Sequence, residues 1–274
     1  MDEKESAFIE AANLTLKTPL GRVYENASFT VKKGQVCALF GTEGSGKTSL
    51  LLTLSGRMKY SSGTATVGGY DLKKQYNKIR DISGISVIER INDVPEYLAV
   101  KDILAADLRL AGKPGNKRAV DDYLAQWKFS DFANTPFRQL SARNRNYFEV
   151  MLACSGNPAL LLVDDIQEGM TQHDSIRMVQ MFQHLAKDRG MTVLFCTNEY
   201  EIARYSDCVV VMSQEAESQR AAVVAATGRW TNIYVAGWAN GTVEAIEPAT
   251  NAATHDDALH DLLTNDPDAG EVCA

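Results

Sequence analysis

Residues 41–48 of this chain are Gly41-Thr42-Glu43-Gly44-Ser45-Gly46-Lys47-Thr48, and they match the pattern G-x-x-x-x-G-K-[ST] at every fixed position. The apolar run Val36–Phe40 precedes this stretch and predicts a buried parallel strand, and the leucine-rich residues 48–57 after it predict a buried helix. In that context, the N–H groups of the turn and of the helix start form a concave positive site for phosphates. We therefore predict that residues 41–48 hold nucleotide phosphates, with Lys47 reaching the β- and γ-phosphates and the Thr48 hydroxyl binding Mg²⁺.

The composition is that of an ordinary globular protein. The chain has 274 residues, 45% of them hydrophobic and 23% charged, which is enough for one large domain or two small ones. A net charge of −7 and a pI near 5.2 argue against a surface built to neutralise nucleic-acid phosphates, so no nucleic-acid partner is expected. The charged start Met1–Glu5 predicts no signal peptide, and no apolar run is long enough to predict a membrane span.

Five cysteines occur, at positions 37, 154, 196, 208 and 273, and none belongs to a C-x-x-C pair. Three of them lie in apolar runs with the character of strands. This pattern predicts small buried side chains in a reducing compartment rather than a disulfide or zinc framework.

The segments around the nucleotide loop have strand character. Residues 7–33 mostly alternate between apolar and polar side chains, with Lys17–Gly21 as a turn, and predict an antiparallel strand pair. Beyond the loop, we expect a strand at Thr64–Val67, a turn at Gly68–Leu72 and a further strand at Ile82–Ile88.

A helical subdomain is expected at about residues 95–156, where leucines and aromatic residues recur at helical spacing. After it, Pro158–Asp165 is an apolar run that ends in two carboxylates, which is typical of strands covered on both faces. A helix around 176–185 and strands at Thr192–Thr197 and Ser206–Met212 follow. Strands that alternate with helices predict an α/β fold with a parallel, doubly wound sheet.

The character of the chain changes after Ser213, so we assign residues 1–213 to a nucleotide-binding domain and residues 214–274 to a C-terminal extension. Trp230–Ile246 alternates enough to predict a β-hairpin with Asn240-Gly241 at its turn. From Glu247 onward, the chain is acidic and poor in large apolar groups. This last part is predicted to be solvated and mobile, and a charged interaction tail is the alternative.

A phosphate loop, a helical insertion and an apolar strand ending in aspartate, in this order and at these separations, resemble the ATPase subunit of ATP-binding cassette (ABC) transporters. The resemblance covers about residues 7–213 and extends to Ile9–Thr15, Ser62–Thr64 and Leu98–Leu104, which look like the family's first strand, first turn and helical-subdomain start. It implies a P-loop NTPase of ABC-ATPase type with an antiparallel β subdomain and an inserted helical subdomain. Within the family, the chain looks most like divergent ATPases found in actinobacteria.

The resemblance implies roles for individual residues. Asp164 would hold Mg²⁺, directly or through water, opposite Thr48. Asp165 lies where the family has the glutamate that polarises the attacking water, and its side chain is one methylene shorter. Its reach differs by more than ~1 Å, and a misplacement of that size can cost about a hundredfold in rate. ATP would be bound by residues 41–48, by Ser49 and, across the dimer, by Ser141.

Other family positions are altered. The signature Leu-Ser-Gly-Gly-Gln appears as Leu140–Asn144, in which Ala142 and Arg143 add side chains where the family's backbone approaches the γ-phosphate held on the opposite subunit. That contact is either weakened or replaced by a charged one from Arg143. The family's switch histidine falls at Asn198, which can donate a hydrogen bond but carries no imidazolium charge. The glutamine that links Mg²⁺ to the membrane partner falls at Arg90.

The aromatic residue that stacks on adenine in the family should fall near Thr18, where this chain has none. Tyr24 is one candidate substitute, but a packing role is the favoured prediction for Tyr24.

These features predict a cytoplasmic ATP-binding subunit, peripheral on the inner face of the membrane, that drives a separate integral-membrane permease. It would form a dimer with a second ATPase chain around MgATP. Whether that chain is a second copy or a consensus-like partner, each site would contain an altered position, so slow hydrolysis is expected. The alternative is an ATP-gated regulatory or scaffold subunit with little or no hydrolysis. A GTPase or kinase is disfavoured because residues 197–200 lack the guanine-reading N-K-x-D pattern.

Overall fold

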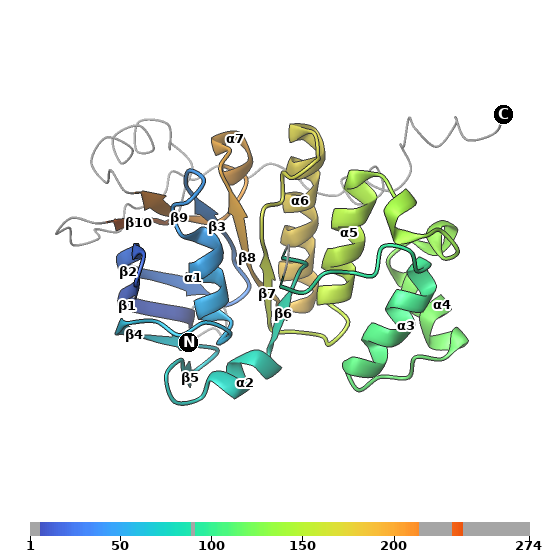
Figure 1. The fold of residues 1–274 in the computed structure, drawn as a ribbon, viewed down its shortest axis with the longest axis horizontal. Helices are drawn as coiled ribbons and strands as arrows, with labels where there is room; N and C mark the ends of the chain where they lie inside the picture. The colour runs from blue at the N-terminus through green and yellow to red at the C-terminus, as the bar shows by residue number, and fades with distance from the viewer. Residues whose placement is uncertain (1–5, 89–90, 214–231, 238–274) are drawn as a thin grey trace.

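A parallel sheet of six strands forms the centre of the computed structural model, which describes residues 6–88, 91–213 and 232–237 (Figure 1). The strand order is β10-β9-β3-β8-β7-β6, and every neighbouring pair is parallel. The bounds are β3 Val36–Phe40, β6 Ser83–Ile85, β7 Leu160–Val163, β8 Thr192–Thr197, β9 Cys208–Ser213 and β10 Asn232–Gly237. The predicted parallel sheet is therefore confirmed.

Both faces of the sheet are buried at the strands β3, β7, β8 and β9. In β3, Val36 and Ala38 pack into one hydrophobic core, whereas Cys37 and Leu39 pack into the other. The first core also contains residues of α5 and α6, and the second contains residues of α1 and the antiparallel strands (Figure 1). These helices are α1 Lys47–Leu54, α5 Ala142–Ala153 and α6 Gln172–Arg189. Because neither face meets water, the strands are continuous apolar runs in the sequence.

A four-stranded antiparallel sheet, in the order β2-β1-β4-β5, packs beside α1. Its strands are β1 Ala7–Thr18, β2 Gly21–Lys32, β4 Ser62–Val67 and β5 Tyr70–Asp71. The predicted strand pair is confirmed, but the prediction of a turn over Gly68–Leu72 is wrong in part. Gly68 and Gly69 make the whole turn with φ values of 57° and 80°, so the chain is already paired with β4 at Tyr70.

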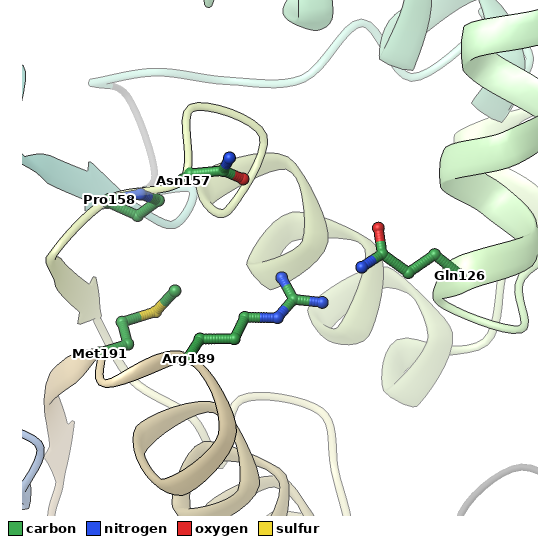
Figure 2. Close-up of a pocket in the computed structure, with 5 residues that line it drawn as sticks. All are labelled: Gln126, Asn157, Pro158, Arg189 and Met191. Atoms are coloured by element: carbon green, nitrogen blue, oxygen red, sulfur yellow. The ribbon is translucent and has the colours of Figure 1, made fainter.

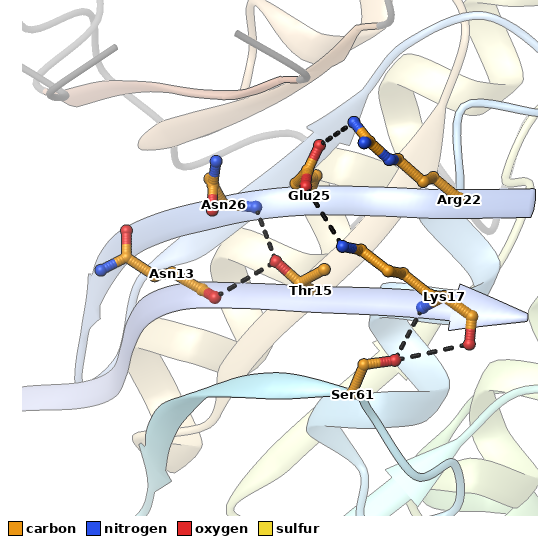
Figure 3. Close-up of polar contacts among 7 residues, drawn as sticks. All are labelled: Asn13, Thr15, Lys17, Arg22, Glu25, Asn26 and Ser61. Atoms are coloured by element: carbon orange, nitrogen blue, oxygen red, sulfur yellow. Dashed lines mark hydrogen bonds and ion pairs between the residues drawn. The ribbon is translucent and has the colours of Figure 1, made fainter. Parts of the chain in front are cut away.

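The hairpin of β1 and β2 is irregular, and a polar network fixes its register (Figure 3). Asn13 and Asn26 both adopt the left-handed region, with φ of 52° and 53°. The Thr15 hydroxyl lies between them: it accepts from Asn26 N at 3.1 Å and donates to Asn13 O at 3.4 Å. Nearer the hairpin tip, Glu25 is 2.7 Å from the Arg22 guanidinium and 3.7 Å from the Lys17 ammonium. The end of the hairpin beside the nucleotide loop is therefore held by side chains as well as by its ladder.

The segment between β6 and β7 is mainly helical, as predicted for residues 95–156, and lies at one end of the molecule (Figure 1). Its helices are α3 Val100–Leu110, α4 Lys117–Gln126 and α5, with short 3-10 turns at Ser130–Phe132 and Phe137–Gln139. Aromatic rings fill its core: Phe129 stacks on Phe148 with centroids 5.8 Å apart, and Trp127 meets Tyr147 edge-on at 5.8 Å.

The remaining described helices are short, α2 Tyr76–Asp81 and α7 Tyr200–Ala203. Within the described residues, no helix combines the length and apolar character that crossing a bilayer requires. Four cysteines, at positions 37, 154, 196 and 208, are free and buried as predicted, while Cys273 lies outside the described residues. Most of the predicted hairpin at 230–246 and the whole acidic tail also lie outside them.

Candidate functional site

The nucleotide loop connects the end of β3 to the start of α1, as its sequence predicts. Two of its glycines leave no space for a side chain. A Cβ on Gly41 would lie 2.2 Å from Met212 O, and a Cβ on Gly46 would lie 2.7 Å from Val23 O. Gly46 also has φ of 91° at the N-cap of α1, a conformation that side chains disfavour. The loop backbone is therefore pressed against β9 and β2, with N–H groups available at the helix start.

Lys47 folds back over this loop. Its ammonium donates to Gly41 O at 2.7 Å and to Thr42 O at 2.8 Å. Nearby, the Ser45 hydroxyl is buried and has no hydrogen-bond partner among the described residues. A cation that donates to two carbonyls and an unsatisfied hydroxyl beside it form a polar environment that suits the oxygens of an anionic ligand.

Thr48 and Asp164 meet, although 116 positions separate them in the sequence. The Thr48 hydroxyl donates to Asp164 Oδ2 at 2.8 Å, because the loop after β3 places the start of α1 at the same edge of the sheet where β7 ends at Val163. Two further contacts hold Asp164: its N–H donates to Ser86 Oγ at 3.3 Å, and the Cys196 thiol hydrogen-bonds to its carboxylate. Complete burial and then the Asp164 charge raise the pKa of Cys196 well above its usual value, so the thiol remains a protonated donor.

Asp165 follows directly and has an unusual backbone. Its φ is 38°, in the left-handed region that non-glycine residues rarely adopt. The side-chain amide of Gln167 donates to Asp165 Oδ1. The residue is exposed, yet partial burial of the carboxyl raises its pKa, with Glu168 and Asp164 adding to the rise and Lys47 opposing it. The carboxylate therefore lies at the edge of the loop in a cluster of like charges.

The predicted signature segment lies at the start of α5. Ser141 caps this helix, and its Oγ accepts from Asn144 N at 3.3 Å. Leu140 is buried, whereas Arg143 forms an ion pair with Asp174 of α6 at 3.8 Å. Ser141 is exposed, and the hydrogen bond described for it stays within its own helix. The structure of this single chain thus does not join Ser141 to the nucleotide loop.

The other residues considered from the sequence are Asn198, Arg90 and Tyr24, and the outcome differs for each. Gly41 N donates to Thr197 O at 3.2 Å, so Asn198 is the exposed residue directly after the strand end that contacts the loop. Arg90 lies outside the described residues. Tyr24 is 2% exposed, and its hydroxyl donates to Thr53 Oγ1 at 2.8 Å. Burial raises its pKa to about 12, so Tyr24 is a packing residue of the core and not a ring available for adenine.

Sequence reasoning missed three residues of this site: Ser86, Cys196 and Gln167, all in contact with Asp164 or Asp165. None belongs to a phosphate-binding motif. The available signal was their position in the sequence relative to predicted strand ends. Cys196 lies near the carboxyl end of a predicted strand, and Gln167 follows the predicted carboxylate pair by two residues.

A separate cavity of about 350 Å³ lies away from these residues (Figure 2). It is lined by Gln126, Asn157, Pro158, Arg189 and Met191, from the ends of α4 and α6 and the segments before β7 and β8. No residue predicted to bind nucleotide lines it. Among the residues that the structure covers, no group of three or more His, Cys, Asp and Glu side chains is arranged to hold a metal ion.

Comparison with known proteins places these features in a family. The family model described as ABC transporter matches residues 24–168, which is more than half of the chain. Similar relatives include the arabinose import ATP-binding protein AraG of Mannheimia succiniciproducens, 26% identical over 75% of this chain and 42% of its own length. The spermidine/putrescine import ATP-binding protein PotA of Nitratidesulfovibrio vulgaris is 27% identical over 96% of this chain and 71% of its own length. ABC transporter A family member 10 of Dictyostelium discoideum is 28% identical, and this chain spans 26% of its length.

Solved structures share the fold. The chain resembles cbiO1 of Clostridium perfringens with a TM-score of 0.66 at 20% identity, covering 76% of this chain and 86% of the other. It resembles a bacterial ABC transporter cassette solved as a dimer with a TM-score of 0.65 at 19% identity, covering 74% and 94%. The α/β fold with its parallel and antiparallel sheets is that of an ABC ATPase cassette, as the sequence predicted. This protein therefore belongs to the ABC transporter family.

Proposed function

We propose that the chain is the ATP-binding, slowly hydrolysing subunit of an ABC transporter and that it drives a separate membrane-spanning partner. The observation that carries this proposal is the juxtaposition of an intact phosphate loop with the Thr48–Asp164 hydrogen bond of 2.8 Å. It joins a site for phosphates to an oxygen pair of the kind that Mg²⁺ prefers. Membership of the ABC transporter family supports the same function.

ATP would enter with its phosphates over residues 41–48 and Ser49. Lys47 would exchange its contacts with Gly41 O and Thr42 O for contacts with phosphate oxygens, because an anionic oxygen is a stronger partner for an ammonium than a peptide carbonyl. The buried Ser45 hydroxyl would gain a partner at the same time. The close packing of Gly41 and Gly46 keeps the backbone donors in place before the ligand arrives.

The residues present fit a magnesium ion. Thr48 and Asp164 would hold it, because their oxygens already meet and both are hard donors. When bound, Mg²⁺ offsets the charge of the phosphates. The Cys196 thiol, which hydrogen-bonds to the Asp164 carboxylate, would keep that carboxylate directed at the ion, and Ser86 Oγ, which accepts from Asp164 N, would hold the backbone beneath it.

Asp165 is the candidate general base. It would take the proton of a water whose oxygen attacks the γ-phosphorus while the bond to the bridging oxygen breaks. Asn198, directly after the end of β8, and Arg90 would sense the γ-phosphate. Hydrolysis is expected to be slow because Asp165 is short for this reach and Asn198 cannot supply a positive charge.

The assembly is part of the proposal. The chain would form a dimer with a second ATPase chain, in which Ser141 contacts nucleotide held by the partner, and it would bind an integral-membrane permease from the cytoplasmic side. Similar relatives are named as import proteins for six different substrates, namely arabinose, spermidine/putrescine, zinc, phosphonates, methionine and ribose, so these names do not identify the substrate transported with this chain.

Two measurements on one preparation test the function: equilibrium MgATP binding and single-turnover ATP hydrolysis. We expect micromolar binding that Lys47→Ala abolishes, and slow cleavage that Asp165→Asn abolishes while binding persists. Binding without any cleavage would favour the alternative, an ATP-gated regulatory or scaffold subunit. Vigorous turnover with Asp165→Asn harmless would refute the role of Asp165.

A further inference from the structure

Of the two polar groups in the Gln167 side chain, one makes a hydrogen bond and the other makes none among the described residues. Its Nε2 donates to Asp165 Oδ1, while its Oε1 is buried and has no hydrogen-bond partner among the described residues. A buried acceptor without a partner destabilises the folded state, and an apolar side chain of the same shape would avoid that cost. Glutamine at this position therefore lowers folding stability through its Oε1, and the hydrogen bond from its Nε2 is the contact that offsets this loss.

The Gln167 amide donates to the carboxylate of Asp165, a residue with an unfavourable backbone conformation and like charges around it. Asp165 has φ of 38°, so its backbone is in an unfavourable region and must be held by its surroundings. Asp164 and Glu168 repel its charge, and Lys47 is the cation that opposes them. The backbone N–H of Gln167 also donates to the carboxylate. Gln167 thus favours the ionised form from two directions without adding a positive charge that would compete for phosphate.

The turn that carries Gln167 is anchored to α5. Asn146 Nδ2 donates to Glu168 O at 3.2 Å and to Ala142 O at 3.0 Å, and Glu168 N donates to Asp165 O at 3.2 Å. A Cβ on Gly169 would lie 3.1 Å from Ala142 Cβ, so the turn packs closely against the helix start. The Gln167 amide is therefore presented from a fixed backbone.

We propose that Gln167 is a positioning residue that directs the short carboxylate of Asp165. The proposal rests on the proposed function, because it takes Asp165 as the base. A short side chain reaches fewer places, so its orientation matters more, and a hydrogen bond from a fixed amide selects one orientation. Gln167 contributes nothing to phosphate or magnesium binding in this arrangement.

The test compares Gln167→Met with the wild type in three measurements. Gln167→Met keeps the length of the side chain and removes both polar groups. We expect an unchanged or raised midpoint of thermal unfolding, MgATP affinity within threefold of wild type, and a single-turnover rate lowered about ten- to hundredfold.

Gln172→Met is the matched control. Gln172 also donates its amide to a carboxylate, Glu199 Oε2, at 3.4 Å, but it lies on the surface of α6 outside the site. It should change none of the three measurements. Gln167→Glu supplies a second arm: it should be slow at high pH and recover in part as the pH falls, because the introduced carboxyl can donate to Asp165 only when protonated.

The outcomes separate the two proposals. If Gln167→Met leaves the rate unchanged while Asp165→Asn abolishes cleavage, the positioning role is wrong and the base stands. If Asp165→Asn cleaves ATP normally, the base itself is wrong. If the wild type cleaves no ATP, Asp165 is not a working base and the positioning role is wrong as well. A large loss of stability in Gln167→Met would assign Gln167 to packing instead.

Discussion

At the scale of single residues, the proposed hydrolysis depends most on Asp165. Its carboxylate accepts a hydrogen bond from Gln167 and lies among like charges. The length of the Asp165 side chain and the hydrogen bond from Gln167 both determine where one carboxylate oxygen of Asp165 would lie relative to the attacking water.

Asp165→Glu should therefore accelerate hydrolysis. The added methylene restores the reach that the family uses, and we expect the single-turnover rate to rise about ten- to hundredfold with little change in MgATP affinity. Quench-flow measurements on both proteins at saturating MgATP check this. A rate that stays at the wild-type value would place the limit elsewhere, at Asn198 or in the signature segment.

Glu149, on α5, should make stability depend on pH. Burial raises the pKa of its carboxyl to about 7, with Glu168 adding to the rise and Arg145 opposing it. The folded state therefore holds this proton more tightly than the unfolded state does, so the stabilising contribution is complete below pH ~4.5 and is lost as the pH rises through ~7. Glu149→Gln should be more stable than wild type at pH 8 by up to about 3 kcal/mol and should be no more stable at pH 4.5.

Urea unfolding of both proteins at several pH values tests this prediction. Glu96→Gln, at an exposed position, is the control and should follow the wild type throughout. An equal gain for both variants at pH 8 would point to net charge rather than to burial of Glu149.

At the scale of elements, the start of α1 shows why particular glycines are needed. Gly46→Ala adds a Cβ 2.7 Å from Val23 O and also forces alanine into φ of 91°. We expect a loss of about 1–3 kcal/mol in the free energy of unfolding and at least tenfold weaker MgATP binding, because the loop must shift from β2.

Gly44→Ala is the matched control for that prediction. Gly44 has φ of 74°, so alanine is strained there too, but a Cβ would have nothing within 4 Å. Calorimetry of both variants with and without MgATP separates the two contributions. Equal effects on stability and affinity would mean that the contact with β2 is unimportant.

The sequence predicted most elements because each has a local signal. The strand Val36–Phe40 and the phosphate loop were predicted at their observed positions, and so was the meeting of Thr48 with Asp164. The contacts of Gln167 and Ser86 could not be predicted, because they depend on the path of the turn after β7 and on the neighbour that β6 provides. Likewise Tyr24 has the sequence position of a ring near nucleotide, and only its burial against Thr53 excludes that role.

At the scale of the whole molecule, the start of α5 bears on the proposed dimer. Ser141 is exposed there, and its described hydrogen bond stays within its own helix, while Arg143 forms an ion pair with Asp174 of α6. In Asp165→Asn, which should trap ATP, adding Ala142→Gly and Arg143→Gly should tighten the MgATP-dependent dimer about tenfold, because the backbone can approach the phosphate. Sedimentation equilibrium with and without MgATP measures this. A dimer that weakens would assign Arg143 a direct contact with phosphate.

A chain shortened to end at Ser213 should aggregate. β9 pairs with β3 along one edge and with β10 along the other, and its residues Val209–Met212 are buried. Removal of β10 leaves an apolar strand with unpaired N–H and C=O groups. Light scattering should show association of the shortened chain, whereas a chain that ends at residue 237 should stay monomeric without nucleotide. A monomeric shortened chain with an unchanged unfolding midpoint would contradict this role of β10.

The place of β10 also has a consequence for synthesis. The ribosome completes the nucleotide loop and the strands around it first, and it adds the strand that covers β9 only after a further 18 residues, 214–231. Because domains begin to fold while the chain is still growing, the nascent protein passes through a stage in which this edge is open to other chains. Protection during translation, by a chaperone or by early binding of ATP to the finished loop, would matter most in that interval.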